Sequence, residues 1–270
     1  MQLKNNMQVE ERDYDFPVEL KPIFALREGH ISGISIEGRR AVVRMDTNKV
    51  IGIVSDKYQL LRHGEVIESF NKAFEGMDFV SNFVIKNNGS RMFARYSFPN
   101  NRIEVREGDF ISMQLIVKNS YDGNSSLQIM LGAFRLVCSN GMVLGNRVMN
   151  FRQRHIGEKG EIDKGKIDGE EIRAKVEFMV ERFTATLPSL KVMAETNLKD
   201  IPADELFTRK RFRLPQYLIE KAKVNYNEDG DHSNWGVYNA LTNAISHNMR
   251  RENTALAIEY GRRVWSAMAQ

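Results

Sequence analysis

The sequence contains one cysteine, Cys138, in 270 residues. A single thiol cannot form an intramolecular disulfide, and it cannot supply a zinc site made of several thiolates. Because Cys138 follows Leu136 and Val137, we interpret it as a small buried residue and not as a nucleophile. The lone cysteine therefore excludes both disulfide-stapled and multi-thiolate zinc folds.

Long apolar runs are also missing. No segment approaches the roughly 18 uninterrupted apolar residues that a membrane helix needs, and residues 1–13 lack the hydrophobic segment of a signal peptide. Hydrophobic residues nevertheless make up 42% of the chain, which is enough for a substantial core. We expect a soluble, cytoplasmic protein without membrane contact.

The familiar catalytic motifs do not occur in this sequence. It has no phosphate-binding GxxxxGK[ST], no HExxH and no GxSxG, and its five histidines are widely scattered. We therefore expect no enzyme activity, no catalytic residue, no metal site and no cofactor. A metal-dependent nuclease stays open as an alternative, because four suitable side chains lie in one stretch: Glu104, Asp109, Lys118 and Asp122.

Positive charge is in modest excess. The formal net charge of +4 does not by itself demonstrate an anionic partner. Its distribution is more informative, because basic residues gather in clusters at 147–154, 209–213, 250–251 and 262–263. Each cluster is explained either by a solvated face or by contact with an anion.

Apolar residues in the first half of the chain alternate as in β-strands. Strand-like runs occupy 31–36, 41–45, 50–61, 79–85, 90–98 and 102–105, with turns at 46–48, 87–89 and 99–101. The turn Asn87-Asn88-Gly89 is a strong hairpin signal. Helical spacing predicts one helix from about Gly64 that ends before Gly76.

After a linker at 157–169 the pattern changes to helices. Five apolar residues share one helix face, which we expect to pack on the sheet: Ile172, Val176, Val180, Phe183 and Leu187. Further helices are predicted at 189–198, 203–211, 216–224, 234–248 and 254–268. In the helix at 234–248, large apolar residues recur at helical spacing and indicate core or subunit contact.

These patterns predict an α+β fold. We expect a curved antiparallel sheet of five to seven strands, backed by a long helix and followed by a helical C-terminal region. The chain divides into an N-terminal arm (1–30), which Pro17 and Pro22 make irregular, and a sheet domain with one helix (31–156). A linker and a helical region packed on the sheet complete it (157–270).

The most informative functional signal lies in residues 110–155. Two apolar runs, Phe110–Val117 and Leu127–Leu136, flank a glycine-centred turn, and a basic tract with an aromatic ring follows. Cations neutralise phosphates, and rings stack on bases. We predict a nucleic-acid groove lined by Lys118, Arg135, Arg147, Phe151, Arg152 and Arg154. Tyr121 is a second candidate for stacking.

Four segments together resemble a family of phage- and plasmid-encoded proteins of unknown function. They are VIGIVSDKYQLLRHGEVIESF, KNSYDGNSSLQIMLGAFRLVCSNGM, FRQRH and NWGVYNALTNAISHN, spread from Val50 to His247. The chain departs from the family pattern at Ile156, where a threonine commonly follows the Arg-His pair. The resemblance implies a mobile-element context and no particular activity. The expected architecture is also similar to the core of phage and eukaryotic single-strand annealing proteins.

These observations lead to a functional expectation with two alternatives. We expect a phage or plasmid protein that binds single-stranded DNA, forms a homo-oligomer and supports recombination or strand annealing without bond chemistry. The first alternative is a protein-interaction factor that engages a host or phage protein, such as a host-defence inhibitor or a replication regulator. The second is the metal-dependent nuclease.

Overall fold

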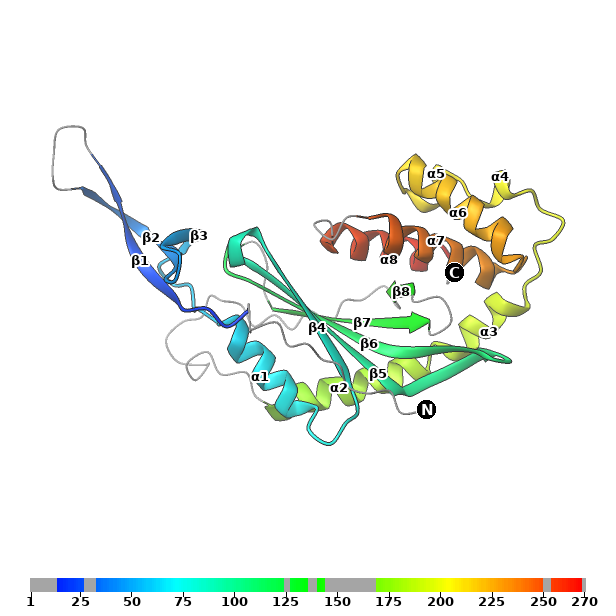
Figure 1. The fold of residues 1–270 in the computed structure, drawn as a ribbon, viewed down its shortest axis with the longest axis horizontal. Coiled ribbons are helices and arrows are strands. Elements are labelled where there is room, and N and C mark those ends of the chain that lie inside the picture. The colour runs from blue at the N-terminus through cyan, green and yellow to red at the C-terminus, as the bar shows by residue number, and fades with distance from the viewer. Residues whose placement is uncertain are drawn as a thin grey trace.

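The computed structural model of the chain describes residues 14–26, 33–123, 127–135, 140–143, 169–249 and 254–268. Within these ranges the strands form two antiparallel sheets, one with the order β1-β2-β3 and one with the order β4-β5-β6-β7-β8. The predicted fold class, a curved antiparallel sheet backed by a long helix and followed by a helical region, is confirmed (Figure 1). The strands of the first half divide between two sheets and do not join a single one.

The small sheet forms an arm that projects from the body of the molecule (Figure 1). Its strands are β1 (Val18–Ala25), β2 (Ile34–Arg44) and β3 (Lys49–Ser55). The expectation of irregular chain before residue 31 is wrong for β1, which pairs with β2 and accommodates Pro22 beside a shift in register. An edge strand tolerates proline at such a shift, because one backbone donor need not join the ladder.

The large sheet contains the longest strands. They are β4 (Val80–Lys86), β5 (Arg91–Arg106), β6 (Asp109–Ser120), β7 (Gln128–Arg135) and β8 (Asn140–Val143). The hairpin predicted at Asn87-Asn88-Gly89 is confirmed, because this 3₁₀ turn, η1, joins β4 and β5 with positive φ at all three residues. The turn predicted at 99–101 is wrong: β5 continues, and its pairing with β6 resumes at Arg102 after a bulge.

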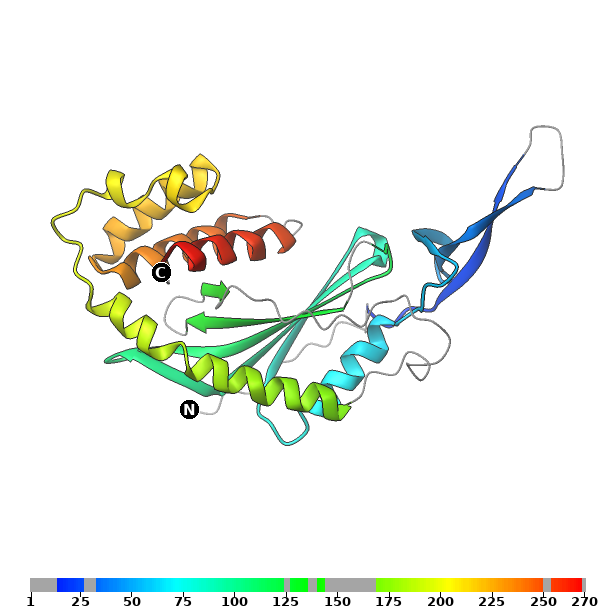
Figure 2. The same ribbon diagram turned by 180° about the vertical axis from the view of Figure 1, so that it is seen from behind.

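One face of the large sheet packs on α1 (His63–Ala73) and α2 (Gly169–Thr184), which lie along it (Figures 1 and 2). Phe70 of α1 stacks on Tyr96 of β5 with ring centroids 5.9 Å apart, and Phe74 meets Phe98 edge-on at 5.1 Å. Most of the predicted apolar stripe of α2 is confirmed: Ile172, Val176 and Phe183 are buried in the same core, and Val180 packs partly against it. The stripe is wrong at Leu187, because α2 ends at Thr184 and Leu187 begins the next helix.

The C-terminal helices complete the fold. They are α3 (Leu187–Glu195), α4 (Ala203–Leu206), α5 (Arg209–Phe212), α6 (Gln216–Asp229), α7 (Asn234–Asn248) and α8 (Thr254–Met268). The helix predicted at 203–211 is divided, because α4 ends at Leu206 and Thr208 caps α5. The apolar residues of α7 are buried as expected, among them Trp235 and Tyr238.

Helices α7 and α8 lie against β8, across the sheet from α1 and α2 (Figures 1 and 2). On this face, the part of the large sheet around β4 extends beyond α7 and α8 (Figure 1). None of the helices in the described part of the chain combines the length and the apolar character needed to cross a bilayer.

Candidate nucleic-acid interface

Two of the segments that carry the family resemblance meet at the base of the arm. Asn119 Nδ2 donates hydrogen bonds to the Leu61 carbonyl and to His63 Nδ1, both at 3.0 Å. The His63 backbone N–H donates to Tyr121 Oη at 2.7 Å, and the two rings stack with centroids 4.0 Å apart. We call His63, Asn119 and Tyr121 the junction cluster. It fixes the end of β6 against the start of α1.

His63 is held neutral in this cluster. Its Nε2 donates to the Gly89 carbonyl at 2.9 Å, so Nδ1 is free of a proton and accepts from Asn119. Burial lowers the pKa of His63 to about 4, and the hydrogen bond to Gly89 opposes part of that shift. The ring is fully buried. Its position makes it a structural link between α1, η1 and β6.

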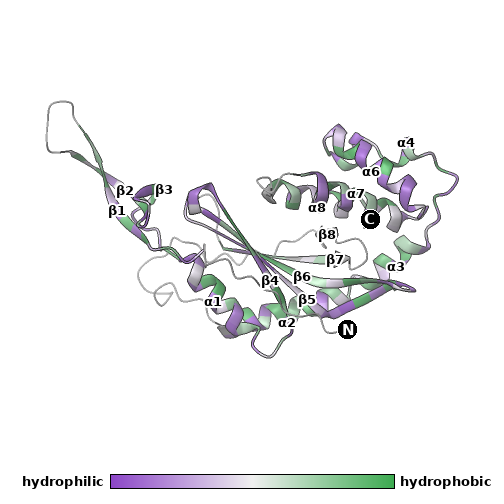
Figure 3. Cartoon of the chain, viewed as in Figure 1, coloured by the Kyte–Doolittle hydropathy of each residue, from purple (hydrophilic) through white to green (hydrophobic). Residues whose placement is uncertain are grey.

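Four cations of the large sheet share the face that looks away from α1 and α2. Lys86 pairs with Arg91 across β4 and β5, and the register of β5 and β6 places Arg95 opposite Ile116 and Lys118 opposite Phe93. Successive side chains of a strand point to opposite faces, so these four positions point the same way. We call Lys86, Arg91, Arg95 and Lys118 the cationic face. Figure 3 shows hydrophilic residues at the adjoining tip of the β4–β5 hairpin.

The electrostatics of this face favour an anion. Lys86 and Arg91 are directly opposite each other, and like charges in that arrangement destabilise a sheet. Asp122 offsets part of this repulsion through an ion pair with Arg91 at 2.6 Å. Burial lowers the pKa of Lys118, Arg91 lowers it further, and Asp122 raises it. Within the described part of the chain, Asp122 is the one carboxylate that pairs with these four cations, so the face keeps an excess of positive charge.

A small pocket borders the cationic face where α8 approaches the sheet. Its volume is about 150 Å³. The sheet and α8 both contribute to its lining: Phe93, Lys118, Gln128, Met130, Ile258, Glu259 and Arg262. We call this the α8 pocket. Since Lys118 belongs to both features, the cations of the sheet and the polar groups of α8 form one continuous surface.

The predicted binding residues fall into three groups. Lys118 lies on the cationic face. The backbone position of Arg135 pairs with Ile111, an odd number of residues along β6 from Lys118, so the two positions belong to opposite faces. The other four lie outside the described residues: Arg147, Phe151, Arg152 and Arg154. The second stacking candidate, Tyr121, is wrong, because only 1% of its surface is exposed.

Sequence reasoning missed four residues of this surface. Arg91 and Arg95 stand in a strand that was expected, and Lys86 lies one residue beyond the expected run at 79–85. The two-residue periodicity of a strand was the signal that could have placed Arg91 and Arg95 on one face. Arg262 was noted only as part of a basic pair. Nothing local in the sequence indicates that α8 reaches Lys118.

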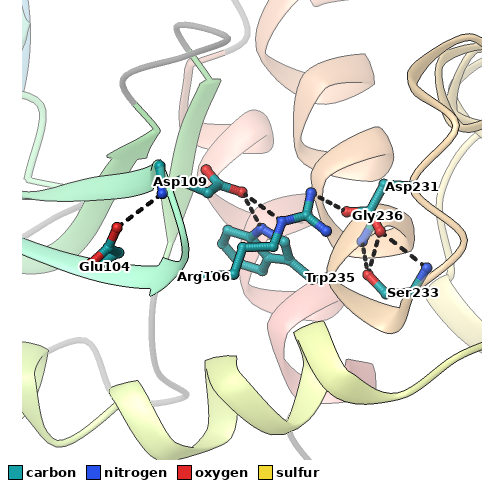
Figure 4. Close-up of polar contacts among 8 residues, drawn as sticks. Glu104, Arg106, Asp109, Asp231, Ser233, Trp235 and Gly236 are labelled. Atoms are coloured by element: carbon teal, nitrogen blue, oxygen red, sulfur yellow. Dashed lines mark hydrogen bonds and ion pairs between the residues drawn. The ribbon is translucent and has the colours of Figure 1, made fainter.

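Asp109, a candidate metal ligand of the nuclease alternative, ties the β5–β6 hairpin to the start of α7 (Figure 4). Trp235 Nε1 donates to Asp109 Oδ2 at 2.8 Å, and Arg106 Nε lies 3.6 Å from the same oxygen. Arg106 Nη2 reaches Asp231 Oδ2 at 2.8 Å, next to the N-cap Ser233. These contacts give Asp109 a role in joining the sheet to the helical region.

The two aspartates of the nuclease alternative are far apart. Asp109 begins β6 and Asp122 follows its end, and this strand has 12 residues. At about 3.3 Å per residue, roughly 40 Å of extended chain separate them, so one metal ion cannot bridge the pair. In the ranges that the structure describes, no three His, Cys, Asp or Glu side chains form a group that could hold a metal.

Comparison with known proteins places the chain in a family. The family described as "Domain of unknown function (DUF932)" matches residues 50–265. The chain belongs to this family. Two proteins of Escherichia coli (strain K12), UPF0380 protein YfjQ and UPF0380 protein YafZ, are each 39% identical to it over 67 residues. This match covers 24% of the chain and 23% of either relative. No solved structure matches the chain.

The DUF932 match confirms the resemblance seen in the sequence. Its range contains the junction cluster, the cationic face and the α8 pocket, whereas β1 and β2 of the arm precede it. In this DUF932 member, two of the resembling segments hold the end of β6 in place, and a third begins α7 beside Asp109.

Proposed function

We propose that this chain is a phage or plasmid protein that binds single-stranded DNA and supports recombination or strand annealing without bond chemistry. The observation that carries the proposal is the cationic face, where Lys86, Arg91, Arg95 and Lys118 point the same way from three adjacent strands. Each contact between a cation and a phosphate releases counterions and so strengthens binding at low salt.

The dimensions of the surface favour one strand over a duplex. Adjacent strands of a sheet lie about 4.8 Å apart, so the strip from Lys86 on β4 to Lys118 on β6 is about 10 Å wide. That width fits one sugar-phosphate backbone. Annealing needs no catalytic group, because a strand held by its backbone leaves most base edges free to find a complement. A homo-oligomer would lengthen the strip.

The test is binding of a fluorescent oligothymidine of roughly 30 nucleotides, longer than the 4–16 that one such site covers. Anisotropy is measured at about 50 and 200 mM salt, with a duplex of equal length in parallel. We expect salt-sensitive binding that is tighter for the single strand, followed by acceleration of annealing. Absence of binding at the lower salt, or tighter binding of the duplex, contradicts the proposal.

The arm favours a protein-interaction factor as the second candidate function. Phe24, Leu26 and Ile34 are 53%, 81% and 65% exposed near its outer end. Apolar side chains in such a position are suited to contact with another protein. If the chain is a protein-interaction factor, replacing all three by serine should release a co-purifying protein. If it is a single-stranded DNA-binding protein, the same replacement should leave oligothymidine binding by the monomer unchanged.

A further inference from the structure

The α8 pocket combines apolar walls with a polar rim. Phe93 and Met130 of the sheet face Ile258 of α8, while Gln128 and Glu259 add hydrogen-bonding groups. Its volume of about 150 Å³ is below the roughly 300–1,000 Å³ of pockets for drug-sized ligands. A site of this size and composition suits a single planar ring system. The adjacent Lys118 makes it continuous with the cationic face.

The charged rim is held in place by contacts within α8. Glu259 Oε2 lies 3.2 Å from Arg262 Nη1, and Glu259 Oε1 lies 3.2 Å from Arg263 Nε. A carboxylate has about four lone-pair sites, so these two contacts leave room for further donors. The side chain of Glu259 is 43% exposed and that of Arg262 is 38% exposed. Both side chains therefore reach solvent at the rim of the pocket.

Guanine matches this rim better than the other bases. Its O6 and N7 are neighbouring acceptors, and a Lys or Arg side chain can donate to both of them. Lys118 and Arg262 supply such donors at the rim. Its N1–H and N2–H₂ are neighbouring donors on the Watson–Crick edge, which suits the Glu259 carboxylate. Thymine offers one such donor, and cytosine and adenine offer an amino group without an adjacent ring N–H. Unstacked bases of single strands are commonly read on these edges.

We propose that the α8 pocket binds one unstacked guanine of the strand whose backbone lies on the cationic face. The ring enters between Phe93, Met130 and Ile258, and its polar edges meet Glu259, Arg262 and Lys118. This assignment rests on the proposed function. One guanine held per subunit would anchor the strand, while the neighbouring bases remain available for pairing.

The test compares an oligothymidine with matched oligomers in which one central thymine is replaced by guanine, adenine or cytosine. The wild-type protein is compared with Glu259→Gln and with Glu68→Gln, a control at an exposed site on α1. We expect the guanine oligomer to bind about fivefold tighter or more than the others. Glu259→Gln should abolish that ratio, and Glu68→Gln should keep it.

Each other outcome is decisive. Equal binding of all four oligomers by the wild type overturns the guanine site and leaves single-strand binding standing. Binding of none of them overturns both proposals. A guanine preference that persists in Glu259→Gln overturns the role of this carboxylate. If dGMP competes with oligothymidine while the guanine oligomer has no advantage, the pocket takes a free nucleotide and the strand assignment fails.

Discussion

Lys86 on β4 lies directly opposite Arg91 on β5. Two cations in this arrangement weaken the sheet, and pairs of opposite charge stabilise it by roughly 0.2–1 kcal/mol. We therefore expect Lys86→Glu to raise the free energy of unfolding by up to about 1 kcal/mol in urea titrations while it weakens DNA binding. The charge-matched control is Lys191→Glu, at an exposed site on α3, which should leave DNA affinity unchanged. A Lys86→Glu protein that binds DNA as tightly as the wild type would remove Lys86 from the interface.

The salt dependence of binding should report the cationic face directly. Arg95 is exposed and Lys118 is half-buried beside the α8 pocket. Each phosphate contact on a single strand contributes about 0.7 to the slope of log affinity against log salt. In the double variant Arg95→Gln, Lys118→Gln, we expect the slope for oligothymidine, which offers Lys118 no guanine, to fall in magnitude by about 1.4. The measurement is anisotropy over a salt series, and an unchanged slope would contradict the assignment.

Much of the fold was predictable because its patterns are local. Alternation along β6 and helical spacing in α2 and α7 each reflect one buried face, so the sequence alone locates these elements. The sequence predicts a turn at Pro99, where the structure has a bulge, because proline occurs in turns and in bulges alike. What decides between them is the continued pairing of β5 with β6 beyond Arg102, and that contact is not local.

The candidate site was only partly predictable. The neighbours of Lys118 in sequence predict a binding role for it, whereas in the structure Lys118 lies beside Phe93, across the strand pair, and shares a pocket with Arg262 of α8. Those contacts depend on strand register and on the packing of a helix more than 100 residues away. The alternation of side chains along β5 could have placed Arg91 and Arg95 on one face of the sheet. No local pattern shows which face a distant helix such as α8 covers.

The stability of the fold should depend on pH through His63. Its pKa of about 4 in the folded protein lies below the ordinary 6.5, so the unfolded chain takes up the proton first as the pH falls. This contribution is complete above about pH 6.5 and is lost as the pH falls toward 4, by about 3 kcal/mol in total. Urea unfolding at several pH values in this window should show a steeper loss for the wild type than for His63→Gln, which cannot titrate. Parallel curves for the two proteins would show that His63 is not the group responsible.

Gly52 should be the least replaceable glycine of the small sheet. A Cβ atom there would lie 2.2 Å from the Tyr121 carbonyl oxygen, in the backbone that supports the junction cluster. We expect Gly52→Ala to cost about 3 kcal/mol, because neither backbone can yield easily. Gly38→Ala is the comparison: it has a positive φ of 70° but nothing within 4 Å, so only backbone strain of about 1 kcal/mol opposes it. Thermal unfolding of both variants tests the order, and a larger loss for Gly38→Ala would contradict it.

The bond between Trp235 and Asp109 should matter for stability and not for DNA binding. Trp235→Phe removes the indole donor and leaves one oxygen of a buried carboxylate without its 2.8 Å partner. Such a loss costs about 1–3 kcal/mol beyond the change in packing. Trp265→Phe, which makes the same change in size at a buried site of α8, serves as the control. Urea unfolding should show the greater loss for Trp235→Phe. The oligothymidine affinity of this variant should be unchanged, because Asp109 lies at the end of β6 opposite to Lys118. Equal losses in the two variants would show that the hydrogen bond adds nothing to stability. A separate outcome would favour the metal-dependent nuclease: a metal-dependent cleavage of DNA that disappears in Asp109→Asn.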